Sequence, residues 1–416
     1  MSPFEVFATL TTLAAVFSWV NQRWVRLPTT IGLMVIAMLS SLGLVVLHAT
    51  GVVPVDPLIP VIRDFDFHAA LLNGMLGALL FAGSIHLKLD DLFAHRWAIV
   101  LLATGSVVLS TVIVGCASWA VFRALGLGVP IIHCLLFGAL ISPTDPIAVG
   151  ATLRQAGVSR SLNVKLTGES LFNDGFGVVV FLVVLQLATA GEPVVLSHVA
   201  RLFAQQAFGG VLYGLAVGYV TYRMLRSVDN YQVEILLTLA LTTGGYALAQ
   251  RLQVSGPLAM VVAGLMVGNR GRASAMSQRT QERLDSFWEL IDEFMNAMLF
   301  VLIGVEVVVL DFDSRFIGAG LLMIPLVLLA RGISVGLPIS LLRALRRAVS
   351  PHAIKLLTWS GLRGGISVAL ALSLPSGGHS DLLVTVTYIV VAFSIVVQGL
   401  TVGPLAKRLA STSARA

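Results

Sequence analysis

Two polar clusters inside long apolar stretches of the chain each contain an aspartate. In the first, GALISPTDPIAVGATL, Asp145 lies between Pro143 and Pro146. A proline removes a backbone donor and disfavours helix at the residue before it, so we expect the helix to break across 142–146. The break would leave carbonyl groups and the Thr144 hydroxyl beside a carboxylate, packed in protein or lining a cavity. A simple proline kink with a buried, protonated aspartate is the alternative.

The second cluster, LTGESLFNDGFGVVVF, places polar residues on one face of a predicted helix. Glu169 and Asn173 are four residues apart, as are Ser170 and Asp174. One stripe therefore presents carboxylate, amide and hydroxyl groups. Oxygen ligands of this kind suit a hard, partly dehydrated cation. For Glu169 and Ser170, a polar network that only packs helices together remains an open alternative.

A third cluster, TWSGLRGGISVALALSLP, surrounds Arg363 with glycines in an otherwise apolar segment. The glycines predict a second broken or closely packed helix, the partner of the first in an inverted repeat. Arg331 is the other cation inside a predicted span. A buried guanidinium needs a carboxylate, and Glu169 is the best one left unassigned, so we predict a Glu169–Arg331 ion pair.

The composition indicates that these clusters lie in a membrane. Hydrophobic residues make up 57% of the 416 residues and charged residues 12%, against roughly half and a quarter in globular proteins. The mean hydropathy is +0.92. Soluble enzymes, disulfide scaffolds and disordered chains are excluded, because too few polar groups are present to cover a water-facing surface.

A bilayer core of about 30 Å needs about 20 apolar residues per helix. The sequence predicts an all-α polytopic protein with about thirteen transmembrane helices. Their expected limits are 4–20, 29–50, 68–87, 97–122, 129–152, 162–190, 199–222, 232–249, 254–269, 287–310, 316–342, 353–375 and 382–406.

The basic residues are distributed unevenly between alternate sides of these spans. Twenty of the 27 lie in loops of one side and in the tail, five lie on the other side, and Arg331 and Arg363 lie within spans. Positive charge gathers on the cytoplasmic side. We therefore expect a multi-pass protein of the plasma (inner) membrane with its N-terminus outside and its C-terminus cytoplasmic. The same placement argues against a nucleic-acid partner.

Five motifs carry a resemblance to a known family. They are SPTDP at 142–146, GESLFNDG at 168–175, FVLIGVE at 300–306, GLRGG at 361–365 and FSIVVQGLT at 393–401. In this order, over nearly the whole chain, they resemble the monovalent cation:proton antiporter superfamily, in its sodium/proton exchanger branch with NhaP-type members.

The resemblance implies a fold of two inverted six-helix repeats with broken, crossing helices. It implies a single transmembrane antiporter domain at 1–409, divided into a core with helices around 68–190 and 287–406 and a dimerisation domain, and a short cytoplasmic tail at 410–416. A homodimer in membrane lipid is expected. Gly210, Gly214 and Gly218 have a small-xxx-small spacing, which permits close helix packing within one chain or between two.

The resemblance also implies roles for the clustered residues. Asp174 would bind the cation or the proton, and a bound sodium ion would contact Asp174, Asp145, Ser170 and Thr144. Asn173 would steady the site, Glu169 would pair with the family arginine matched by Arg331, and Arg363 would serve helix packing or pH response. Ala82 stands where some relatives have a glutamate, so their coordination details do not transfer.

One carboxylate that takes either a proton or a monovalent cation gives electroneutral one-for-one exchange, since Asn173 is neutral. We expect exchange of Na⁺, and also Li⁺, for H⁺ in pH homeostasis, with K⁺/H⁺ exchange on the same fold as the alternative. A cation channel and an intramembrane aspartyl protease built on Asp145 and Asp174 are the more distant alternatives. The sequence carries no nucleotide-binding or hydrolase motif, so we expect neither a cofactor nor enzymatic activity.

Overall fold

In the computed structural model of the chain, every regular element of the described residues is a helix. The structure describes residues 3–51, 74–145, 153, 156, 158–190, 196–309, 313–345, 352–375, 377 and 379–413. Pro146, parts of the predicted spans 68–87, 129–152 and 287–310, and tail residues 414–416 lie outside this part of the chain.

The helices follow the order of the predicted spans, but α16 begins at Gln278, before the predicted limit of 287, and α8 ends at Ile141, short of the predicted limit of 152. In the first half they are α1 (Pro3–Val20), α2 (Thr29–Ala49), α4 (Leu76–Ile85), α5 (Leu89–Ala94), α6 (Arg96–Val100), α7 (Ser106–Ala124), α8 (Ile131–Ile141) and α10 (Arg160–Ala190). In the second half they are α11 (Leu196–Leu225), α12 (Tyr231–Ala240), α13 (Tyr246–Arg251), α14 (Gly256–Met266), α15 (Arg272–Ser274), α16 (Gln278–Val305), α17 (Ser314–Ala344), α18 (Ala353–Ser360), α19 (Gly365–Leu372), α20 (Ser380–Phe393) and α21 (Gly399–Ser413).

Short turns of other helix types join several of these elements. The π-helical turns are η1 (Asn21–Val25), η3 (Leu101–Gly105), η4 (Leu241–Gly245), η5 (Val267–Gly271) and η7 (Ser394–Gln398), and η6 (Glu306–Val309) is a 3₁₀ turn. The π-helical turns widen a helix locally and often occur at functional positions, whereas a 3₁₀ turn narrows it. Helices α20 and α21 thus form one long helix through η7.

Seven helical stretches of the described part are long and apolar enough to cross a bilayer, and α4 and α8 are shorter apolar helices. The helical membrane fold predicted from the sequence is confirmed, whereas the count of thirteen spans stays a prediction. Helix α21 differs from the expectation. It continues to Ser413, past the expected start of the tail at 410.

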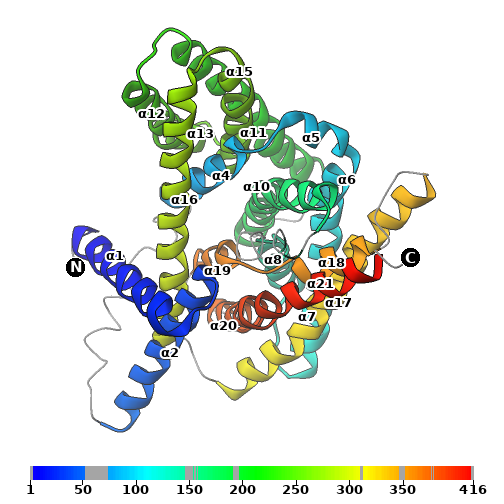
Figure 1. The fold of residues 1–416 in the computed structure, drawn as a ribbon. Helices are drawn as coiled ribbons and strands as arrows, with labels where there is room; N and C mark the ends of the chain where they lie inside the picture. Colours follow the sequence, from blue (N-terminus) through cyan, green and yellow to red (C-terminus); the bar gives the residue numbers. More distant parts are fainter. Residues whose placement is uncertain are drawn as a thin grey trace.

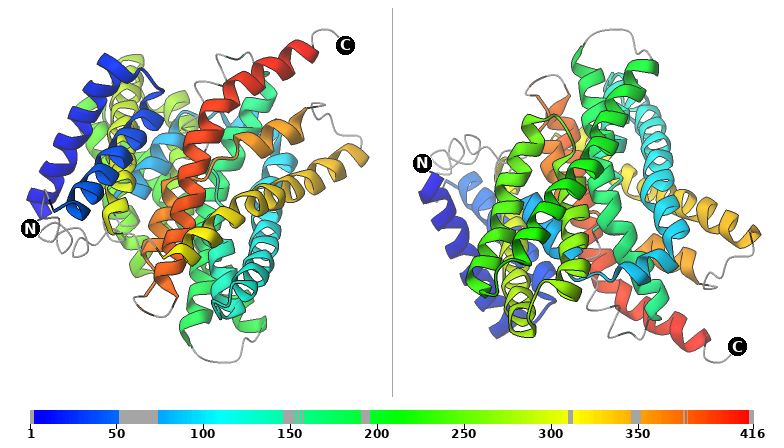
Figure 2. Two further views of the ribbon diagram at one scale, coloured as in Figure 1. Left: turned by 90° about the horizontal axis from the view of Figure 1, so that it is seen from below. Right: turned by 90° about the horizontal axis from the view of Figure 1, so that it is seen from above.

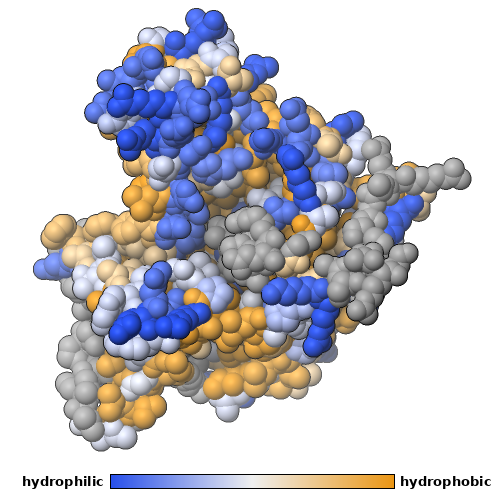
Figure 3. Space-filling view, viewed as in Figure 1, coloured by the Kyte–Doolittle hydropathy of each residue, from blue (hydrophilic) through white to orange (hydrophobic). Residues whose placement is uncertain are grey.

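Two packed groups of helices surround the clusters identified in the sequence (Figures 1 and 2). Helices α7, α8, α10, α17, α19 and α20 pack together, and α2, α4, α11, α14 and α16 form a second set of contacts. Helix α10 also contacts α14, so it adjoins both groups. Hydrophilic residues gather over α12, α13 and α15, and apolar residues over α20 (Figure 3).

The regularly spaced glycines of α11 pack against another helix of the same chain. Gly210, Gly214 and Gly218 face α14, and a Cβ added at Gly214 would overlap the backbone of Ala259. The absence of side chains therefore lets the two backbones touch. The spacing permits close packing within one chain or between two, and in this structure the glycines of α11 pack within one chain.

Candidate ion-binding site

Two non-helical segments cross in the middle of the molecule. Helix α8 ends at Ile141 and residues 142–145 are not helical; α18 ends at Ser360 and α19 begins only at Gly365. The amide of Asp145 donates a 2.8 Å hydrogen bond to the carbonyl of Leu362. Backbone groups away from water need partners, and here each break supplies one for the other. The two predicted breaks are therefore present and in contact.

Thr144 connects the first break to α10. The Asn173 amide nitrogen donates to Thr144 Oγ1 at 2.7 Å, and the Thr144 amide donates to Asn173 Oδ1 at 3.3 Å. The Ser170 hydroxyl donates to the Thr144 carbonyl. All three residues are buried. The Asn173 side chain therefore both donates to and accepts from the first break.

Asp145 and Asp174 directly follow Thr144 and Asn173 in the sequence. Asp174 is 8% exposed and Asp145 9%, and the two carboxyl groups are close enough to interact electrostatically. Asp174 Oδ1 is buried and accepts no hydrogen bond from any described residue. Burying a charged oxygen without a partner is costly, and a proton or a bound cation would each remove that cost.

Small residues allow the segments to approach the carboxylates. A Cβ added at Gly364 would overlap the side chain of Asp145, and one at Gly177 would overlap the ring of Pro143. Gly364 has extended backbone angles and directly precedes α19. The sequence indicated the glycines around Arg363, but not that Gly364 would contact Asp145.

Glu169 and Arg331 form a buried ion pair next to the site. Glu169 Oε1 lies 2.6 Å from Arg331 Nη2, and the two side chains are 1% and 4% exposed. The Asn173 amide also donates to Glu169 Oε1 at 3.4 Å. A Cβ at Gly361 would overlap the Arg331 guanidinium. The pair therefore fastens α10 to α17 beside the second break.

Arg363 binds the carbonyl groups at the end of α8. Its Nη1 donates to the carbonyls of Ser142 at 2.5 Å and Pro143 at 3.1 Å, and its backbone amide donates to Ser394 Oγ at 2.8 Å. A cation is stabilised at the C-terminal end of a helix, where carbonyls lack partners. These hydrogen bonds join the end of α8 to the second break and to η7.

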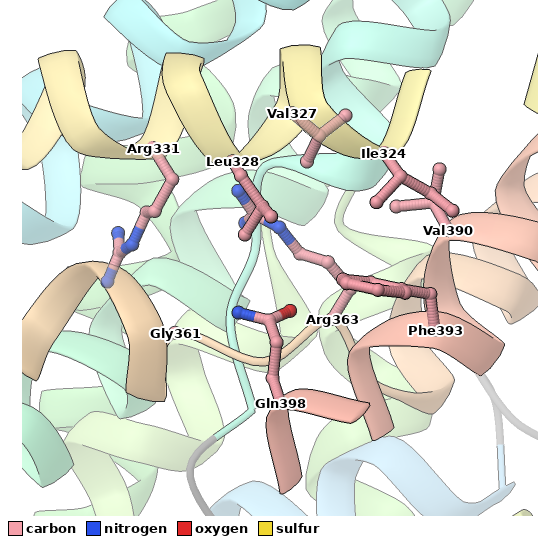
Figure 4. A pocket seen from close by; sticks show the side chains of 9 residues that line it. All are labelled: Ile324, Val327, Leu328, Arg331, Gly361, Arg363, Val390, Phe393 and Gln398. Carbon is pink, nitrogen blue, oxygen red and sulfur yellow. The ribbon is translucent and has the colours of Figure 1, made fainter. Parts of the chain in front are cut away.

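A cavity of about 10 Å³ lies between these groups, close to the volume that one water molecule needs. Figure 4 shows Arg331, Arg363 and Gln398 reaching it from α17, the second break and η7. Gln398 accepts a hydrogen bond from Ser394 and donates to the Trp359 carbonyl. The sequence did not predict that Ser394 and Gln398 would lie at this site. The one feature of the sequence that marked them is their position in the FSIVVQGLT motif.

Ala82 lies buried in α4, and a Cβ added at its neighbour Gly83 would lie 3.6 Å from the Leu171 side chain of α10. This part of α4 therefore faces the helix that carries Asp174, but it contributes no carboxylate. The candidate oxygen ligands among the described residues lie in the first break and in α10.

The fold and site define a helical membrane transporter with a buried acidic centre between two broken helices. The family model described as sodium/hydrogen exchanger, transmembrane, matches residues 10–408, and the chain belongs to that family. The resemblance drawn from the five motifs is thus confirmed.

Individual relatives extend over nearly the same length. The chain is 48% identical over 410 residues to the Na(+)/H(+) antiporter NhaP of Pseudomonas aeruginosa, covering 97% of this chain and 96% of that one. It is 33% identical over 367 residues to the Na(+)/H(+) antiporter NhaH of Halobacillus dabanensis, covering 84% and 88%. The structure of the sodium proton antiporter MjNhaP1 from Methanocaldococcus jannaschii superimposes with a TM-score of 0.76 at 19% identity, covering 98% of both chains.

Proposed function

We propose that the chain exchanges Na⁺, and also Li⁺, for H⁺ by electroneutral one-for-one antiport at Asp174. In this mechanism the Asp174 carboxyl carries a proton on one leg of the cycle and a cation on the other. Asp145, the Thr144 carbonyl and Ser170 complete the oxygen ligands, and Asn173 holds the break in place. Sodium as substrate is supported by the names of the relatives with 48% and 33% identity.

The observation that carries this proposal is the state of Asp174. Its Oδ1 atom is buried without a hydrogen-bond donor among the described residues, next to a segment whose carbonyl and hydroxyl oxygens are also buried. An ionised carboxylate in that setting is stabilised by a cation, and a neutral one by a proton. The same oxygen atoms can therefore hold either a proton or a cation, but not both at once.

The neutrality of Asn173 supports the stoichiometry. Its side chain is committed to Thr144 and Glu169, and Glu169 is neutralised by Arg331. Asp174 is then the carboxylate whose charge changes between the two legs. The protonated and sodium-loaded sites carry the same charge, so exchange moves no net charge.

Three further expectations belong to the same proposal. The N-terminus lies outside and the C-terminus in the cytoplasm of a plasma-membrane protein. The helices around 68–190 and 287–406 form a core that works beside a dimerisation domain, and the protein is a homodimer. No observation favours potassium exchange, a channel or an aspartyl protease over sodium/proton antiport.

Proteoliposomes that contain a pH-sensitive dye test the proposal, with Na⁺, Li⁺ and K⁺ titrated separately. Asp174→Asn should insert and fold but lose exchange with each cation. Asp381→Asn, in the exposed first turn of α20, is the matched control and should keep wild-type exchange. Sodium-driven proton movement in Asp174→Asn at more than a small fraction of the wild-type rate would refute the assignment.

A further inference from the structure

Two histidines meet where α8 and α20 begin. His133 is the third residue of α8, and His379 directly precedes Ser380, the first residue of α20. Their ring centres are 5.7 Å apart, with the planes at 73°. Gly377 has a φ of +113°, a conformation that favours glycine, and turns the chain just before His379.

The imidazole of His133 has an unused nitrogen atom. His133 Nδ1 is buried and has no hydrogen-bond partner among the described residues. A cavity of about 180 Å³ is lined by His133, Thr189 and Ser380 together with apolar side chains. In the tautomer protonated at Nε2, the Nδ1 lone pair of His133 can bind a metal ion.

The ring separation fits one metal ion held by both imidazoles. For a tetrahedral zinc ion about 2.0–2.1 Å from each nitrogen, the two ring centres would lie roughly 5–6 Å apart. Neutral imidazole is a frequent ligand of zinc and similar ions. The described residues hold no group of three or more His, Cys, Asp or Glu side chains suited to a metal, so water or hydroxyl oxygens would complete the coordination.

We propose that His133 and His379 form a zinc-type metal site that slows transport when it is occupied. Each histidine stands at the start of a helix that leads to the ion site. Helix α8 runs directly into the break with Thr144 and Asp145, and α20 leads to Ser394, which holds the amide of Arg363. A metal ion that binds both rings favours the conformation in which they are adjacent, so it opposes any step of the cycle that separates the two helix starts.

His133 lies near the start of α8, whereas Thr144 and Asp145 of the proposed ion site follow the end of that helix. A zinc ion bound by the two histidines would therefore lower the maximal exchange rate without competing with sodium. With the N-terminus outside, as proposed above, the starts of α8 and α20 face the outside. Zinc added on that side alone should then inhibit, and a chelator should reverse the inhibition.

The binding test uses purified wild-type protein with zinc chloride and isothermal titration calorimetry at neutral pH. We expect one zinc ion per chain, and affinity reduced by roughly tenfold or more in His133→Gln and in His379→Gln. His198→Gln is the matched control, since His198 is exposed near the start of α11, and it should bind zinc as the wild type does. Unchanged affinity in both test variants, or no binding to the wild type, would overturn the site.

The transport test uses the same proteins in proteoliposomes. Both variants should exchange sodium for protons at the wild-type rate without zinc, and should resist the zinc concentration that halves the wild-type rate. Equal inhibition of wild type and variants, or binding without inhibition, would overturn the link to transport. The calorimetric result stands whether or not the protein proves to be a sodium/proton antiporter, so failure of the site and failure of the proposed function remain distinguishable.

Discussion

The amide of Asp145 donates to the carbonyl of Leu362, and this 2.8 Å hydrogen bond joins two helix breaks that lie far apart in the sequence. The carboxyl group of Asp145 is therefore positioned by a backbone contact with the second break. A substitution in either break should therefore alter the geometry of the proposed ion site through this hydrogen bond.

Gly364→Ala should lower exchange strongly, because its Cβ would overlap the Asp145 side chain. Overpacking of this kind costs about 1–3 kcal/mol of folding stability. We expect the exchange rate to fall by roughly tenfold or more, since an ion site tolerates little displacement. Gly332→Ala is the control: its nearest neighbour is a Thr358 methyl group 3.8 Å away. Equal rates in the two variants, measured in proteoliposomes, would contradict the contact.

Removing either member of the Glu169–Arg331 pair should destabilise the protein by about 3–5 kcal/mol, because one buried charge is left alone. The double variant with both Glu169→Gln and Arg331→Gln should recover part of that loss of stability. A double-mutant cycle on thermal stability in detergent measures the coupling. Strict additivity of the two single losses would argue that the pair contributes no joint energy.

The exposed pair Asp313–Arg315 is the control for that cycle. Hydrogen bonds from Arg315 lower the pKa of the Asp313 carboxyl, but Arg315 is 63% exposed. Solvent screening and side-chain entropy leave an exposed pair of this kind with little net stabilising energy. Its cycle should therefore give little coupling, although its two charged atoms are also within hydrogen-bonding distance.

Lowering the pH should raise the apparent KM for sodium with little change in maximal rate, because proton and cation compete for Asp174. Raising the pH should slow turnover, because the return leg needs a protonated site. The resulting profile is bell-shaped, and more sodium should shift its acid flank to lower pH. Exchange should not respond to a potential clamped with valinomycin. An acid flank that ignores sodium would exclude competition, and a rate that follows the potential would exclude one-for-one exchange.

Gly214→Val should destabilise the monomeric chain by about 1–3 kcal/mol, because the added atoms would overlap the backbone of Ala259. Gly43→Ala in α2, where no atom lies within 4 Å of the added Cβ, should be neutral or slightly stabilising. Thermal unfolding in detergent at concentrations where monomers predominate compares the two. A loss that appears only in dimers would place the stripe at an interface between chains.

The helix break at Pro143 could be predicted because a proline acts on its own backbone and on the residue before it. The Glu169–Arg331 pair could be predicted because few charged residues lie within the spans, so each buried cation has few possible partners. Both arguments are local or compositional. Neither needs the positions of distant segments.

The remaining site contacts depend on those positions. The sequence could not indicate that Leu362 would accept from Asp145, or that Ser394 would hold the amide of Arg363, because any exposed carbonyl or hydroxyl could do the same. The glycine stripe of α11 is similar. Its spacing establishes that some backbone approaches closely, but only the packing shows that Ala259 of α14 is the neighbour.

The uninterrupted length of α16 limits where movement can occur. With 28 residues and a rise of about 1.5 Å per residue, it spans about 42 Å, more than the hydrocarbon thickness. Its first turns carry Arg279, Glu282 and Arg283, and drawing such charges toward the bilayer centre costs about 2.5–3.5 kcal/mol each. Movement of this end of α16 toward the bilayer centre is therefore unfavourable.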